Sequence, residues 1–575
     1  MKHVSFILAI VVLSWCFPGQ RAGAQLDTGK MNALLDQYHR AGVFNGVLLV
    51  AQEDRIIFQA AIGDADMEWK QPNGIDTRFR IGSLTKQFTA ALLLLLMEDG
   101  LIDVEAPLLR YIPEYPKEQA EGVTVHHLLT HTSGIPGYTE LPNFIREIMR
   151  TTYTREEFMK VFSGLPRQFT PGSAFRYSNS GYYLLGVIIE RVTGKSYDQV
   201  LRERLTLPLG LDHTGYEHNT SIIPNMARGY QRIPNGYERT QALDSSVPFA
   251  AGMLYSTAGD LLRWTRLLHT GKVFAKKETL EMMITPTHDG YACGLKISAI
   301  PVKGSTVRNI HHSGGINGFS SQLWYLPDET YTIVALDNTM SNAGLAAETA
   351  FALLYDLRAP LFRFPISEEV AAIIDTEGVD KALMRYRELK DSAAERYDFS
   401  EQELNGLGYY YMGKGKLDIA QRLLALNLEM FPDAFNAWDS MGEIHMNMGN
   451  KDEAIRHYRR ALELNPGSGN AIAMLKKLGV EVETVPVSVP ESVLDSYLGR
   501  YELQPGFVLT VTREGTQLRM QATGQPRVDV YPATETKFYL KVVDAQVTFV
   551  RDDNGSVHEL ILHQGGRDMP AKRIP

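Results

Sequence analysis

Three short segments contain residue types that together can carry out nucleophilic chemistry. In the first, RIGSLTKQFTAALLLLLMEDG, Ser83 stands three residues before Lys86 at the head of an apolar run. Positions i and i+3 share one face of a helix, so both side chains can point into one cleft. Serine becomes a useful nucleophile when a neighbouring amine takes its proton, which requires that burial or nearby charge lowers the lysine pKa. Taken alone, the segment is more typical of a helix-capping serine followed by a solvated lysine.

The second segment, FRYSNSGYYLLG, places Tyr177 and Asn179 in a turn before an apolar helix. A tyrosine close to an ammonium group can share a proton with it, and an asparagine amide can bond both a lysine and a substrate carbonyl. The alternative is a plain turn in which Ser178 and Asn179 cap the helix that follows.

The third segment, NIHHSGGINGFSSQLWYLP, contains His312 and Ser313 followed by Gly314 and Gly315. Glycines permit close approach of the backbone to a ligand, and a strand follows at once. The backbone N–H of Gly315 is therefore a candidate second donor to an oxyanion, opposite the N–H of Ser83. A glycine-rich hairpin turn is the alternative.

A metal site is the remaining chemical alternative. His127 and His131 are four residues apart and would share a face if the segment were helical. No third ligand stands nearby, so the sequence favours no metal and no cofactor.

The elements that position these segments read as a mixed domain. The segment GVLLVAQEDRIIFQAAIG predicts a β-hairpin, DLLRWTRLLHTG a helix, and SSQLWYLPDETYTIVALDN a pair of strands. Strands and helices do not alternate regularly, so we expect an α+β domain with an antiparallel sheet, helices on its faces and an all-helical subdomain.

A 34-residue regularity begins after this domain. The segment from Leu404 aligns with the segment from Trp438 at that offset, with Gly408 matching Gly442 and Pro432 matching Pro466. The pattern resembles the tetratricopeptide repeat, in which small residues let two helices pack closely. A less regular copy surrounds Gly378, and such a copy can cap a short solenoid.

The ends of the chain differ from its middle. Residues 1–24 have a basic start, an apolar stretch and a small-x-small ending, which predicts a secretory signal and export to the periplasm or beyond. A membrane anchor is the alternative, but the apolar stretch is shorter than the roughly 20 residues that span a bilayer. At the other end, alternating runs around Glu514-Gly515 and Asn554-Gly555 predict antiparallel hairpins of a small sheet or barrel.

Length and charge limit the function classes. The chain has 575 residues and 44% hydrophobic residues, which suits several globular domains. We place them at residues 25–362, 363–483 and 484–575. The net charge of −9 is small for this length and no long basic run appears, so nucleic acid and anionic membrane are not expected partners.

Taken together, the three motifs resemble the penicillin-recognising serine hydrolases of β-lactamase fold. The resemblance is nearest to the branch of class C β-lactamases, D-aminopeptidases and serine esterases. Ser83-Leu84-Thr85-Lys86 matches the family's Ser-x-x-Lys motif, Tyr177-Ser178-Asn179 its Tyr-x-Asn motif, and His312-Ser313-Gly314 stands where the lactamases carry Lys-Thr-Gly. The C-terminal hairpins resemble the lipocalin-like β-domain that follows some members.

The resemblance implies a mechanism. Ser83 would attack a carbonyl, Lys86 and Tyr177 would share the role of general base and then protonate the leaving group, and water would resolve the acyl-enzyme. The amides of Ser83 and Gly315 would form the oxyanion hole, while Asn179, His312, Ser313 and Gly314 would contact substrate.

His312 departs from the family pattern. Where a lysine gives a permanent positive charge, a histidine is mostly neutral near pH 7. We therefore expect an ester, amide or D-amino-acid peptide as substrate more than a D,D-carboxypeptidase or β-lactamase substrate. A third hypothesis is an inert domain in a scaffold that binds peptidoglycan or a partner protein through the repeats. The oligomeric state is not predicted.

Overall fold

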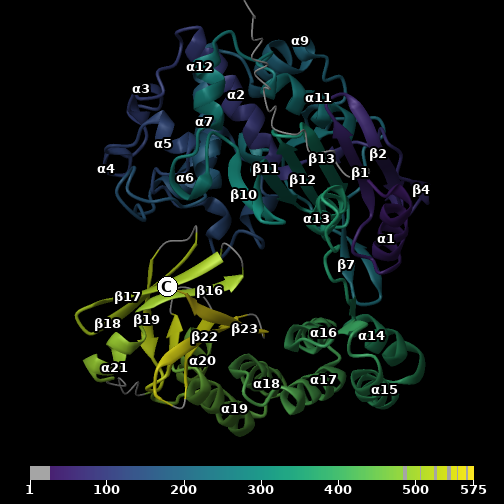
Figure 1. Ribbon diagram of the computed structural model, residues 1–575, viewed down its shortest axis with the longest axis vertical. Coiled ribbons are helices and arrows are strands. Elements are labelled where there is room, and N and C mark those ends of the chain that lie inside the picture. The colour runs from purple at the N-terminus through teal and green to yellow at the C-terminus, as the bar shows by residue number, and fades with distance from the viewer. Residues whose placement is uncertain are drawn as a thin grey trace, which may run out of the picture.

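The computed structural model describes residues 26–482, 489–504, 507–523, 527–540, 545–552, 554–564 and 567–574. The predicted signal at residues 1–24 lies outside them. Figure 1 shows a mixed α/β part at the top, an arc of helices along the bottom and a small β-barrel between the end of that arc and the upper part. Within the described ranges, no helix combines the length and the apolar character that a membrane span needs.

The upper part is built on a six-stranded antiparallel sheet. Its strand order is β10-β11-β12-β13-β1-β2, so the N-terminal hairpin pairs with the last strand of the domain. This confirms the predicted α+β class. The strands are β1 (Gly46–Gln52), β2 (Arg55–Ile62), β10 (Lys296–Val302), β11 (Ser305–Ile316), β12 (Phe319–Leu326) and β13 (Tyr331–Asp337).

Strand β1 is buried on both of its faces. Val47 and Leu49 pack into one hydrophobic core, whereas Leu48 and Val50 pack into another on the opposite face. Successive side chains of a strand point to opposite faces, so an uninterrupted apolar run is what a strand between two helical layers requires. Helices α1 (Thr28–Arg40) and α13 (Ala343–Leu354) cover the second core.

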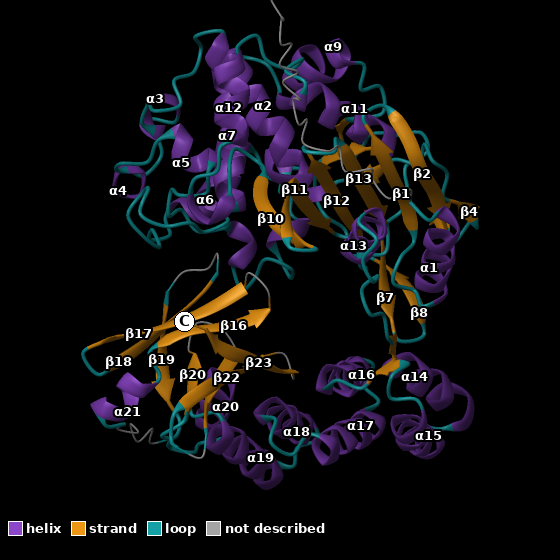
Figure 2. Cartoon of the chain, in the orientation of Figure 1, coloured by secondary structure: helices purple, strands orange, loops and turns teal. Residues whose placement is uncertain are grey.

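The helices on the first core cover one face of the sheet and form the predicted all-helical subdomain beside it. Helix α2 lies at its centre and is buried almost throughout, which explains its run of leucines. The helices are α2 (Thr85–Glu98), α3 (Leu108–Tyr111), α4 (Lys117–Ala120), α5 (Val125–Leu129), α6 (Arg155–Ser163), α7 (Asn179–Thr193), α8 (Tyr197–Leu201), α9 (Leu207–Leu209), α10 (Phe249–Gly252), α11 (Ala258–His269) and α12 (Lys277–Ile284). Figure 2 shows α3, α4, α5, α6, α7 and α12 together to the left of the sheet, beyond β10.

Short strands form two further small sheets in this domain. Strands β5, β9 and β6 form one small sheet, and β3 pairs with β4. These strands are β3 (Asp64–Asp66), β4 (Gln71–Pro72), β5 (Phe79–Arg80), β6 (Gly215–Tyr216) and β9 (Leu254–Ser256).

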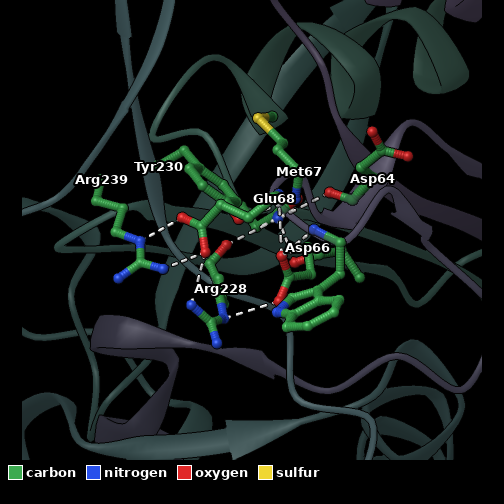
Figure 3. A network of polar contacts seen from close by, with 10 residues as sticks. Asp64, Asp66, Met67, Glu68, Arg228, Tyr230 and Arg239 are labelled. Atoms are coloured by element: carbon green, nitrogen blue, oxygen red, sulfur yellow. Dashed lines mark hydrogen bonds and ion pairs between the residues drawn. The ribbon is translucent and has the colours of Figure 1, made fainter.

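A hairpin, β7 (Tyr230–Ile233) and β8 (Gly236–Arg239), runs from this domain to the helical arc. At its base, the Glu68 carboxylate accepts hydrogen bonds from Arg228 and Arg239, as Figure 3 shows. At its tip, Arg232 forms an ion pair with Glu368 of the arc. The hairpin is thus fastened at both ends.

The helical arc consists of antiparallel pairs. Helices α16 and α18 begin 34 residues apart, at Glu401 and Phe435, and so do α17 and α19, which confirms the predicted repeat period. A Cβ on Gly442 would lie 2.8 Å from the Tyr458 ring, so the glycine permits the close pairing of helices. The helices are α14 (Ile366–Glu377), α15 (Val379–Ser392), α16 (Glu401–Gly413), α17 (Leu417–Met430), α18 (Phe435–Asn447), α19 (Lys451–Leu464) and α20 (Gly469–Lys477), with the short strands β14 (Phe364–Pro365) and β15 (Tyr397–Asp398) at the start of the arc.

The C-terminal strands close into an eight-stranded antiparallel barrel in sequence order. The turns at Glu514-Gly515 and Asn554-Gly555 connect neighbouring strands, as predicted. The elements are α21 (Glu491–Ser496), β16 (Gly499–Gln504), β17 (Phe507–Glu514), β18 (Gln517–Ala522), β19 (Val528–Pro532), β20 (Lys537–Leu540), β21 (Ala545–Arg551), β22 (Val557–Gln564) and β23 (Arg567–Ile574).

Candidate active site

Ser83 lies in a tight turn between strand β5 and helix α2. The turn, Gly82–Leu84, is a single 3₁₀ turn in which Gly82 has φ of +51°, a conformation that favours glycine. A Cβ on Gly82 would lie 2.8 Å from the Gly315 nitrogen, and one on Gly314 would lie 2.1 Å from the Ile81 oxygen. Glycines on both sides therefore let β11 lie directly against the turn that carries Ser83.

The Lys86 side-chain nitrogen is surrounded by three oxygen atoms. Its Nζ lies 3.1 Å from Ser83 Oγ, 2.8 Å from Asn179 Oδ1 and 2.7 Å from the Ala251 carbonyl oxygen. The serine and the amide thus come from two predicted motifs, while the carbonyl comes from α10. The first two motifs, which are far apart in sequence, meet at one nitrogen.

Lys86 is completely buried, and among the described residues it has no carboxylate partner. Burial lowers the pKa of Lys86 well below its usual range because a charge loses its hydration in the interior. A lysine can act as a base when burial lowers its pKa, and a buried amine without a counter-ion meets this condition.

Tyr177 and Asn179 flank the start of helix α7. Ser178 caps this helix, with its Oγ accepting from the Gly181 N–H at 3.3 Å, so the capping alternative holds for Ser178. Asn179 has a different role: its Nδ2 donates to Thr139 Oγ1 at 3.1 Å, which orients Oδ1 toward Lys86.

The Tyr177 hydroxyl is buried and makes no well-formed hydrogen bond with a described residue. Burial raises the pKa of Tyr177, and the Ser83 hydroxyl acts in the opposite direction. Lys86 Nζ lies 4.8 Å from the centroid of the Tyr177 ring. At neutral pH the phenol is therefore protonated.

His312 lies on β11 with only 6% of its surface exposed. Its Nε2 lies 3.0 Å from the Tyr291 hydroxyl, and its Nδ1 lies 2.6 Å from the Ser313 carbonyl oxygen. Burial, followed by the nearby Lys86, lowers the pKa of His312 to about 3. The ring is neutral near pH 7 and both of its nitrogens have partners.

The neighbours of His312 alternate along the strand. Ser313 and Gly315 are exposed, whereas His312 and Gly314 are buried. The face of β11 that a ligand can reach therefore presents Ser313 and the backbone of Gly315, and not the histidine ring.

A family model described as Beta-lactamase matches residues 29–357, more than half of the chain. The chain belongs to the beta-lactamase family. Its members include serine hydrolases with esterase, amidase and peptidase activities. A Tetratricopeptide repeat model matches residues 435–468 of this beta-lactamase-family protein, which confirms the predicted repeat, and a model described as Domain of unknown function (DUF3471) matches residues 483–573.

Two relatives and one solved structure extend the comparison. The beta-lactamase-family chain is 25% identical over 553 residues to Penicillin-binding protein 4* of Bacillus subtilis, covering 92% of this chain and 95% of the relative. It is 32% identical over 206 residues to Esterase EstB of Burkholderia gladioli, covering 32% of this chain and 51% of the relative. The octameric penicillin-binding protein homologue from Pyrococcus abyssi shares the fold, with a TM-score of 0.51, 19% identity and coverage of 95% of this chain and 100% of that one.

The metal alternative at His127 and His131 does not survive in the beta-lactamase-family structure. Helix α5 ends at Leu129, and His131 follows with φ of +58°, so the two rings do not share a helix face. His127 Nδ1 accepts from the Thr124 N–H as part of a capping box, and His131 Nδ1 accepts from the Ser178 N–H. Both histidines have structural partners.

One other group of metal-ligand types occurs within the described residues. His445, Glu453 and His457 have side-chain ligand atoms within 4.8 Å of one another. Arg456 already donates to the Glu453 carboxylate and lies 3.5 Å from His457 Nε2. A guanidinium therefore takes the cation position, and we assign no metal there.

Three partners in the beta-lactamase-family site were not found from the sequence. The Ala251 oxygen is a backbone atom, so the residue type at this position does not reveal its role. Thr139 and Tyr291 lie in segments without a motif, so their contacts with Asn179 and His312 depend on the fold alone.

Proposed function

We propose that this serine hydrolase works through an acyl-enzyme on Ser83, with Lys86 as the base that activates it. The observation that carries the proposal is the set of three oxygens around Lys86 Nζ. A neutral amine has two N–H donors and one lone pair. The Asn179 and Ala251 oxygens are amide acceptors that cannot donate, so they take both N–H groups, and the lone pair is left for the Ser83 hydroxyl proton.

The remaining groups fit the steps that follow. Ser83 Oγ attacks the substrate carbonyl, and the amides of Ser83 and Gly315 stabilise the oxyanion, a role that the close approach of Gly82 to Gly315 supports. Tyr177 is protonated at neutral pH, which favours it as the proton donor to the leaving group over a phenolate base. Water then hydrolyses the acyl-enzyme.

The environment of His312 supports a proposal for the substrate class. A neutral ring whose two nitrogens both have partners offers no cation to a free substrate carboxylate. We propose an ester, an amide or a D-amino-acid peptide bond as the substrate, contacted by Asn179, Ser313 and the β11 backbone. The likeness to Esterase EstB supports this class. A D,D-carboxypeptidase or β-lactamase activity is the alternative, to which the likeness to Penicillin-binding protein 4* gives support.

Export and domain organisation complete the proposal. The pattern of residues 1–24 supports a secretory signal. Separate hydrophobic cores support units at 25–362, 363–483 and 484–575. The repeat match supports a protein partner for the helical unit, which is the basis of the scaffold alternative.

The test is the mass of the intact mature protein after exposure to three substrates. They are a short p-nitrophenyl ester, a D-amino-acid amide and a chromogenic lactam, and product release is followed at the same time. We expect ester or amide turnover and an acyl adduct that Ser83→Ala abolishes. Turnover that survives Ser83→Ala would refute the nucleophile, and turnover of lactam alone would favour the alternative substrate class. Absence of adduct and turnover with all three would favour the scaffold.

A further inference from the structure

A buried histidine outside the three motifs lies directly against the segment that carries Tyr177. His131 is 1% exposed and follows helix α5 in the left-handed conformation, with φ of +58°. Residues other than glycine rarely adopt this conformation, and an observed case points to a specific role for the side chain.

Two hydrogen bonds that His131 accepts enclose Tyr177 along the chain. The Arg176 N–H donates to the His131 carbonyl oxygen at 3.0 Å, and the Ser178 N–H donates to His131 Nδ1 at 3.1 Å. The imidazole also packs on the phenol, with 4.3 Å between the ring centroids. One residue therefore holds the backbone before Tyr177, the backbone after it and the ring itself.

The second of these bonds depends on the side chain. Other bonds between the two segments, such as Gly172 N–H to the Thr132 oxygen at 2.8 Å, join backbone atoms and need no particular residue type. His131 Nδ1 is a side-chain acceptor, and a change of residue type removes it.

The imidazole is held in the accepting form. Since Nδ1 accepts from the Ser178 N–H, the ring proton lies on Nε2, which has no hydrogen-bond partner among the described residues. The rings of Tyr182 and Tyr291 lie 5.1 and 4.6 Å away. Burial lowers the pKa of His131 well below its usual value, so the imidazole remains neutral.

We propose that His131 is a positioning residue for the reaction, and that its side chain fixes the Tyr177 hydroxyl relative to Ser83 and Lys86. The proposal rests on the proposed function, since His131 positions Tyr177, which is the proton donor of that reaction. A misplacement of about 1 Å in such a group lowers a rate by about 100-fold. His131 does not lie on β11, so we expect substrate binding there to change little when His131 is substituted.

The test compares two substitutions of similar size. His131→Asn retains a side-chain acceptor and tolerates the positive φ, whereas His131→Leu removes the acceptor. We expect His131→Leu to lower the rate constant for acylation of Ser83 by about 10- to 100-fold, with KM changed less than about threefold. We expect His131→Asn to retain the rate constant within about fivefold.

Two further measurements separate positioning from a loss of stability. His127→Asn alters the neighbouring histidine, which caps α5 and does not touch Tyr177, and we expect it to lower the melting temperature without changing the acylation rate constant. In a Tyr177→Phe background, His131→Leu has no hydroxyl left to misplace. We expect its effect there to fall below about threefold, because residues that act through one another are not additive.

The outcomes are distinguishable. Failure of the unaltered enzyme to acylate Ser83 would overturn the proposed function and this inference together. Acylation by the unaltered enzyme with an equal rate constant in His131→Leu would overturn the inference alone. So would a loss of equal size in the presence and absence of the Tyr177 hydroxyl, because it would show that His131 acts by general packing.

Discussion

Two buried ionisable groups in the same domain, Lys86 on helix α2 and Asp337 at the end of β13, have opposite kinds of partner. Asp337 is fully buried and accepts from the N–H groups of Asn45 at 2.8 Å, Thr339 at 2.8 Å and Ser341 at 3.2 Å, and from Thr339 Oγ1 at 2.9 Å. Three of those four donors are backbone N–H groups, which can never accept.

Lys86 likewise has one hydroxyl among its partners. Two of its three neighbours are fixed acceptors, but the third is a hydroxyl, which can donate as well as accept. Neither region has a counter-ion among the described residues. The two hydroxyl partners differ in access: Thr339 is 1% exposed and donates to the buried carboxylate, whereas Ser83 is partly exposed, so only the Ser83 oxygen can be reached by a substrate.

The largest effect is expected from Lys86→Met, which keeps the shape of the side chain and removes the amine. We expect the rate constant for acylation of Ser83 to fall by about 10²- to 10⁴-fold, since the base is lost. The melting temperature should stay the same or rise, because a buried amine without a counter-ion is removed. Stopped-flow acylation with an ester and calorimetry measure the two quantities. Lys160→Met, at an exposed position on α6, is the matched control and should change neither.

The next largest effect is the pH dependence of stability that Asp337 causes. Burial raises the pKa of Asp337 to about 6, against a usual 3.8. A folded-state pKa above the unfolded value adds stability at low pH, and that stability is lost as the pH rises from about 4 through 6. The difference corresponds to about 3 kcal/mol in the free energy of unfolding.

An asparagine does not titrate, so the free energy of unfolding of Asp337→Asn should not show this decline as the pH rises. We expect the melting temperature of the unaltered protein to fall between pH 4.5 and 7.5 by more than that of Asp337→Asn, while the acylation rate constant of the folded variant stays unchanged. Calorimetry at the two pH values gives the comparison. Parallel profiles would show that the carboxyl is not the titrating group.

A smaller effect is expected where the catalytic region gains a charge. His312→Lys places an ammonium near β11, where the unaltered ring is neutral. We expect kcat/KM for a peptide with a free C-terminal carboxylate to rise about tenfold relative to a p-nitrophenyl ester, which corresponds to about 1.4 kcal/mol. Competition between the two substrates measures the ratio. An unchanged ratio would mean that His312 does not determine the substrate class.

Residue types and spacing predicted much of both the fold and the site. The 34-residue period predicted the repeat, and the hairpin turns predicted β17–β18 and β21–β22. Three motifs predicted Ser83, Lys86, Tyr177, Asn179 and His312 as site residues, and the structure brings the first two motifs to one nitrogen.

The rest depended on tertiary contacts. The Ala251 carbonyl has no signature because every residue has one, and the orientation of Asn179 depends on Thr139. The spacing of His127 and His131 suggested a shared helix face, which the end of α5 at Leu129 excludes. These features follow from where separate segments meet, and a pattern along one segment does not contain that information.

The pH dependence of Ser83 acylation in Asn179→Asp is the most direct test of a neutral Lys86 as the base. In the unaltered protein, Asn179 Oδ1 lies 2.8 Å from Lys86 Nζ. The substitution keeps an acceptor oxygen at this position and adds a negative charge. An opposite charge at this distance raises a lysine pKa by about 1–3 units. Because the base must be neutral, the acid side of the profile should move to higher pH by at least about one unit. An acid side at the same pH in both proteins would contradict the account.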